Sequence, residues 1–145
     1  MFPFTVIIYG TLAAVAAFLL EIIFLTGFSL GLITFIIGAL IEEGMKLLFL
    51  FQYQKRFCSS MPSSPPLRFL FFALFGIGFA FFEIFLALPM NTEILLALIS
   101  VHTLTSLILG YTLLTRKLSH FLLPAGLVLA IGIHVTYNLL ITSLQ

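Results

Sequence analysis

Two adjacent glutamates, Glu42 and Glu43, stand in the middle of a long apolar stretch of this chain. A carboxylate at membrane depth costs on the order of a few kcal/mol, so a pair of them there calls for a reason. Lys46 follows one helical turn later and can neutralise one carboxylate, which leaves the other for chemistry. Two carboxylates in a low dielectric repel each other, so we expect one to carry a proton. The alternative is a structural ion pair that holds two helices together.

A third carboxylate, Glu83, lies in a later apolar stretch, four residues after Phe79. This spacing places an aromatic ring and a carboxylate on one helix face. The spacing has little weight alone, because the chain contains 18 phenylalanines and Glu83 could instead extend towards the outer membrane interface. Because the glutamate pair is also present in this chain, we interpret Glu83 as part of the same site.

Two histidines and an asparagine complete the polar set. His134 and Asn138 are four residues apart, so both can donate hydrogen bonds to one oxygen, as an oxyanion-stabilising site requires. His102 has Ser106 on the same face one turn later. Polar contacts between helices are the alternative for all three residues. Glu21, near the outer end of its apolar stretch, is expected at the interface and outside the site.

The composition is that of an integral membrane protein. Hydrophobic residues make up 62% of the 145 residues and charged residues only 8%, too few to cover a soluble domain. The net charge of +1 and the absence of a basic patch argue against nucleic-acid binding. The single cysteine excludes an intramolecular disulfide and a cysteine metal cluster.

Five apolar runs of roughly 20 residues each predict an all-α bundle of about five transmembrane helices in one domain. The runs are continuously apolar, which favours helices over a barrel. No Lys or Arg precedes the first run, so we expect a retained helix and not a signal peptide. The predicted spans are Phe4 to Leu25, Phe28 to Phe51, Leu67 to Leu88, Ile94 to Leu114, and Phe121 to Leu144.

The basic residues predict the orientation of this bundle. They occur in the second and fourth connections, which lie on the same side of a five-span protein. Arg116 and Lys117 are the basic residues of the fourth connection. The positive-inside rule then places the N-terminus in the cytoplasm and the C-terminus outside. Counted along the helices, the polar residues of four spans fall at comparable levels in the outer half of the membrane. We therefore expect one shared site facing the extracytoplasmic side.

The order of these motifs resembles that of the PrsW family of intramembrane proteases, within the larger group of type II CAAX prenyl endopeptidases and bacteriocin-processing enzymes. The resemblance runs from Glu42 to Asn138 and consists of Glu-Glu-x-x-Lys, Phe-x-x-x-Glu, His and His-x-x-x-Asn on successive helices. It implies cleavage of membrane-anchored proteins or peptides on the extracytoplasmic side. The chain is short for this family, which leads us to expect a partner membrane protein or a homo-oligomer.

The resemblance also implies a role for each residue. Glu42 or Glu43 activates water while the other is held by Lys46, and Glu83, where CAAX-type relatives usually have His, assists. His134 and Asn138 stabilise the oxyanion, and His102 completes the cluster. Two mechanisms remain open: zinc bound by Glu83, His102 and His134, or a metal-free glutamate mechanism, which we favour.

Two other functions stay open. The first is a non-catalytic scaffold or immunity-type protein that keeps the fold, and the second is a small proton-coupled carrier with a Glu and His relay. The carrier is disfavoured because the polar groups gather at one level. For the protease, we expect substrates to approach laterally past small, lipid-facing residues such as Gly76 and Gly78. These glycines would also allow close helix approach.

Overall fold

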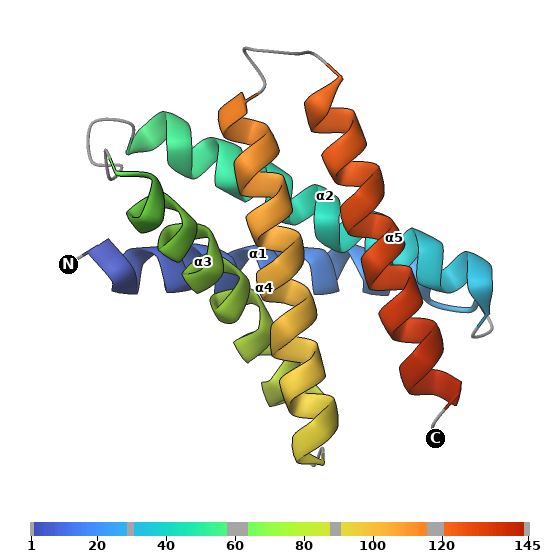
Figure 1. Ribbon diagram of the computed structural model, residues 1–145. Coiled ribbons are helices and arrows are strands. Elements are labelled where there is room, and N and C mark those ends of the chain that lie inside the picture. Colours follow the sequence, from blue (N-terminus) through green and yellow to red (C-terminus); the bar gives the residue numbers. More distant parts are fainter. Residues whose placement is uncertain (1, 29–30, 58–63, 88–90, 116–120, 144–145) are drawn as a thin grey trace.

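The computed structural model describes residues 2–28, 31–57, 64–87, 91–115 and 121–143, and these residues form helices joined by short connections (Figure 1). The predicted all-α fold is confirmed, and the helices lie within a few residues of the predicted spans. Their bounds are α1 Phe2–Leu25, α2 Leu32–Arg56, α3 Pro65–Ala87, α4 Thr92–Thr115 and α5 Leu122–Ser143.

Local chemistry sets several of these helix ends. Gly27 has φ of 95°, a left-handed conformation that glycine adopts without a steric penalty, and it follows the end of α1. Proline fits the first turn of a helix, and α3 begins at Pro65. The Ile94 N–H donates to Oδ1 of Asn91 over 2.8 Å, so Asn91 caps α4.

Four of the helices in the described ranges, α1, α3, α4 and α5, are long and apolar enough to cross a membrane. This supports the assignment as a membrane protein. α2 falls outside this group because three charged residues, Glu42, Glu43 and Lys46, stand in its middle. A fifth span through α2 therefore stays a prediction. Arg116 and Lys117, on which the predicted orientation depends, lie outside the described residues.

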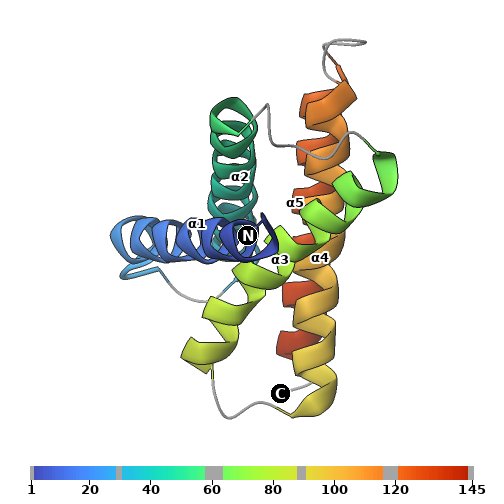
Figure 2. The same cartoon turned by 90° about the vertical axis from the view of Figure 1, so that its left-hand side faces the viewer.

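The helices do not all run in one direction. α4 and α5 are antiparallel neighbours, whereas α1 is oriented transverse to them in both views (Figures 1 and 2). α1 packs against α2 and α3, and α3 in turn packs against α4. α2 packs against α1, α4 and α5. The charged middle of α2 is therefore surrounded by other helices.

The core is rich in aromatic residues on one side of this charged segment. Tyr53 of α2 contacts Tyr9 of α1 edge-on, with ring centroids 4.9 Å apart, and Phe71 of α3 at 4.8 Å. Many large apolar side chains point outward instead, among them Phe4, Phe85 and Val128, each at least 69% exposed. Such a surface suits lipid and not water.

Gly76 and Gly78 do not face lipid, which corrects the predicted route of lateral access. Both are buried at helix contacts. A Cβ on Gly76 would lie 2.7 Å from Cα of Thr103 in α4, and one on Gly78 would lie 2.9 Å from the carbonyl carbon of Ile7 in α1. The prediction of close helix approach is confirmed, because these glycines let the α3 backbone touch both neighbours.

Replacing Gly76 should therefore disturb packing. We expect Gly76→Ala to lower the free energy of unfolding by about 1–3 kcal/mol, because α3 and α4 must move apart to admit the methyl group. Gly132→Ala is the matched control, since nothing lies within 4 Å of its added Cβ. Thermal unfolding in detergent measures both variants. Equal midpoints for the two would contradict the packing role of Gly76.

Candidate active site

Lys46 lies at the centre of the polar cluster and is fully buried. Its Nζ donates to Oε1 of Glu43 over 2.6 Å, to Oγ1 of Thr105 over 3.0 Å, and to Nδ1 of His102 over 2.7 Å. An ammonium group has three N–H bonds, so all its donors are used. The Phe79 ring covers Nζ, with the ring centroid 4.4 Å away. Side chains of α2, α3 and α4 thus all contact the ammonium group of Lys46.

The protonation of His102 follows from these bonds. An ammonium cannot accept a hydrogen bond, so Nδ1 of His102 must be the acceptor and Nε2 must carry the proton. Nε2 lies 2.8 Å from Oε2 of Glu83 and therefore donates to this carboxylate. Both ring nitrogens of His102 are occupied, and the ring is fully buried. His102 is a neutral link between Lys46 and Glu83.

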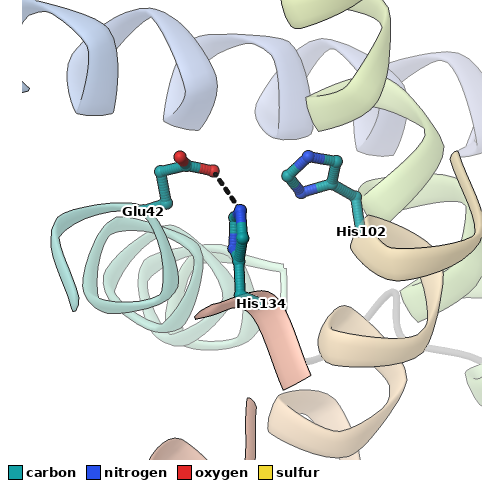
Figure 3. Close-up of side chains that lie close together, drawn as sticks. All are labelled: Glu42, His102 and His134. Carbon is teal, nitrogen blue, oxygen red and sulfur yellow. Dashed lines mark ion pairs between the residues drawn. The ribbon is translucent and has the colours of Figure 1, made fainter. Parts of the chain in front are cut away.

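His134 of α5 has one occupied and one open ring nitrogen. Its Nδ1 lies 2.8 Å from Oε1 of Glu43, and this oxygen accepts a hydrogen bond from Nδ1–H. Its Nε2 then faces Oε2 of Glu42 at 3.6 Å. Figure 3 shows Glu42 and His134 pointing towards each other, with His102 opposite them. The centroids of the two imidazole rings are 5.1 Å apart.

The two adjacent glutamates have different surroundings. Glu43 is fully buried, and its Oε1 accepts bonds from both Lys46 and His134. Glu42 is partly exposed, at 13% for its side chain, and borders two cavities. Oε2 of both glutamates is buried and has no hydrogen-bond partner within the part of the chain that the structure describes, so the two residues differ in their cavities and in their contact with Lys46. Lys46 pairs with Glu43, and the availability of Glu42 for chemistry stays a prediction.

Asn138 lines a cavity that Glu42 also borders. This cavity has a volume of about 390 Å³ and is also bordered by Glu21. His134 uses Nδ1 to bind Glu43, so the predicted pair of donors to a single oxygen is not formed. Of the two predicted donors, the Asn138 amide is the one at the cavity.

Two residues near the site were not assigned to it from the sequence. Glu21 of α1 was expected at the interface, yet it borders both cavities with Glu42. The signal in the sequence was that Glu21 is an acidic residue within an apolar run. Its position near the end of that run favoured the interface instead of the site. Thr105, one turn after His102, binds Lys46 and is fully buried. Its helical spacing from His102 could have indicated this role.

The negative charge of the site exceeds the positive charge. Lys46 balances Glu43, and His102 is neutral in the tautomer deduced above. The remaining carboxyl groups, Glu21, Glu42 and Glu83, come from three helices and border one cavity of about 260 Å³. Carboxylates that line the same cavity carry like charges and repel one another. This crowding of like charges favours a proton shared among the three groups.

The predicted metal ligands need a correction. Glu42, and not Glu83, groups with His102 and His134, with ligand atoms within 4.8 Å of one another. Zinc bonds of about 2.0 Å in a tetrahedron hold ligand atoms roughly 3.3 Å apart, so this group would have to contract. His102 would also have to release Lys46 or Glu83 to free a ring nitrogen. The hydrogen-bonded arrangement and a zinc site therefore exclude each other.

Comparison of the chain with protein-family models, with curated proteins and with solved structures gives no match.

Proposed function

We propose that this protein is an intramembrane protease in which Glu42 activates a water molecule. The observation that carries this proposal is the difference between the two adjacent glutamates. Glu43 is buried and bound by Lys46 and His134, whereas Glu42 borders two cavities. A general base must lie where substrate and water can approach it, as the carboxyl group at the cavities does.

The hydrolytic step uses water and the peptide bond alone. Glu42 removes a proton from water, the water oxygen bonds to the carbonyl carbon, and the carbonyl electron pair moves to oxygen. The Asn138 amide, at the same cavity as Glu42, donates a hydrogen bond to this oxyanion. When the intermediate collapses, the carbon–nitrogen bond breaks. Glu42 then returns its proton to the departing nitrogen, and the products are a carboxylate and an amine.

His134 positions the water in this mechanism. Nδ1–H donates a hydrogen bond to Glu43, so Nε2 carries a lone pair that faces Glu42. This lone pair can accept a hydrogen bond from the water or from protonated Glu42. Lys46 fixes Glu43, which in turn fixes the orientation of the ring. This arrangement is comparable to a carboxylate that holds the catalytic histidine of a hydrolase. Glu83 and His102 complete the chain of hydrogen bonds.

The mechanism requires no metal ion. His102 cannot serve as a ligand while it binds Lys46 and Glu83. We therefore expect a zinc chelator to leave proteolysis within about twofold of the untreated rate. Metal analysis of the active, purified protein should find well under one zinc ion per chain. Loss of activity with chelator, restored by zinc, would instead favour Glu42, His102 and His134 as ligands after rearrangement.

The substrates we propose are membrane-anchored proteins or peptides. The reasons are the apolar outer surface and the resemblance to the PrsW family in the order of the four motifs. The reactive groups lie among the membrane helices, so a substrate has to reach them from the bilayer. In keeping with the predicted orientation, cleavage takes place near the extracytoplasmic side.

The experiment is a comparison of membrane-protein N-termini in cells that make the wild type, Glu42→Gln or Glu93→Gln. Glu93 is an exposed glutamate in the first turn of α4 and serves as the control. We expect new N-termini with the wild type and Glu93→Gln that vanish with Glu42→Gln. Identical profiles at equal protein levels would contradict proteolysis and favour the scaffold function.

A further inference from the structure

Two cavities meet at Glu42. The first, of about 260 Å³, is formed by α1, α2, α3 and α4, and the second, of about 390 Å³, by α1, α2 and α5. Glu42 and Glu21 border both. The cavities therefore adjoin at the carboxyl groups and extend from them in different directions, because α3 and α4 complete the walls of the first and α5 completes those of the second.

The walls of the two cavities differ in chemistry. Apart from its three carboxyl groups, the first cavity is lined only by apolar side chains, including Phe18, Phe82 and Leu98. The second offers the polar side chains of Thr34, Asn138 and Thr142. The Asn138 amide makes no hydrogen bond to other side chains or backbone within the described residues. One cavity suits an apolar side chain and the other suits exposed backbone groups.

From this arrangement we propose that the two cavities bind the residues on either side of the cleaved bond, and that the first selects one large aliphatic or aromatic side chain. The proposal rests on the proposed function, because it takes the bond beside Glu42 to be the one that is cut. In an extended peptide, neighbouring side chains point to opposite faces. The two residues that flank a bond at Glu42 therefore enter different cavities.

The sizes and polarity of the cavities agree with these occupants. A cavity of about 150 Å³ lined by apolar side chains binds benzene, so 260 Å³ accommodates one phenyl ring or isobutyl group. A substrate helix must unwind to expose its peptide bond, and each freed backbone group then needs a partner. The Asn138 amide supplies such a partner in the second cavity. The substrate is thus an unwound membrane segment with one bulky apolar residue next to the cleaved bond.

Two variants change the size of the first cavity in opposite directions. Leu98→Phe fills it, because Leu98 is buried at its wall, and Phe82→Ala enlarges it. Each has a matched control on the same helix that does not border the cavity. Leu96 is 59% exposed and Phe85 is 75% exposed, so Leu96→Phe and Phe85→Ala test the same substitutions at lipid-facing positions.

The measurement is cleavage of a library of single-span peptides by the protein in liposomes, with the cut sites identified by mass spectrometry. The wild type and both controls should prefer Leu or Phe on one fixed side of the cut. Leu98→Phe should shift the kcat/KM ratio of Ala over Phe at that position at least about tenfold towards Ala, since a few carbon atoms in an apolar pocket change selectivity by this amount. Phe82→Ala should shift selectivity towards larger side chains.

The possible failures are distinguishable. If the wild type cuts the peptides but both cavity variants keep its selectivity, the assignment of the cavities is wrong and the proposed hydrolysis stands. If the wild type cuts no peptide, the proposed function and the cavity assignment fail together. Should Leu98→Phe not fold, the direction of the shift in Phe82→Ala alone decides.

Discussion

Glu42→Gln is expected to abolish proteolysis without unfolding the protein. The amide keeps the shape of the carboxylate but cannot remove a proton from water, and a general base contributes about 10²–10⁴-fold to the rate. Glu42 forms no ion pair with Lys46, so the thermal midpoint should stay close to that of the wild type. The rate of cleavage and the midpoint in detergent measure the two effects separately.

Glu43→Gln provides the contrast that tests the division between the adjacent glutamates. This substitution leaves Lys46 buried without its counter-charge and weakens the hold on His134. We expect both activity and stability to fall. Glu93→Gln should change neither. If Glu43→Gln kept its stability and lost activity, while Glu42→Gln remained active, the two glutamates would have the opposite roles.

Lys46→Met is expected to be the most destabilising substitution in the site. It removes the only cation that contacts Glu43, His102 and Thr105 in the described structure and leaves Glu43 as an unpaired charge. Removing one partner of a buried ion pair costs about 3–5 kcal/mol. The predicted result is a large loss of folded protein, measured as the thermal midpoint and as the yield of monodisperse protein in detergent.

A second substitution should reverse part of this loss. Glu43→Gln/Lys46→Met removes both charges, and a neutral buried pair is commonly as stable as the ion pair it replaces. The double variant should therefore unfold at a higher temperature than Lys46→Met, yet remain inactive. Lys55→Met is the matched control, since Lys55 is exposed at the end of α2. A double variant less stable than both single variants would contradict the paired burial.

The convergence of the polar residues could be predicted from the sequence because each lies in an apolar helix. Charges are costly there unless they meet, so Glu43, Lys46 and His134 had to come together. Helical spacing also placed Lys46 one turn from the glutamates, where the ion pair forms. These inferences use only local geometry and the cost of burial, which a sequence determines directly.

The pairing within the site could not be predicted in the same way. Which carboxylate binds which histidine depends on how the helices pack, and α1 lies transverse to α4 and α5 instead of parallel to them (Figure 1). Its packing against α2 and α3 brings Glu21 to the cavities, and this arrangement is not visible in the hydrophobic pattern. Likewise, Glu83 is hydrogen-bonded to His102, and Glu42 is the carboxylate that groups with the two histidines.

The most direct test is hydrolysis by the purified protein in liposomes, in water enriched in oxygen-18. Membranes from cells that make Glu42→Gln supply uncut substrates. With wild-type protein we expect new N-termini, and each matching new C-terminal carboxylate should contain one oxygen-18 atom from water. Both should be absent with Glu42→Gln. No new termini with the wild type, or equal amounts with Glu42→Gln, would contradict water activation by Glu42.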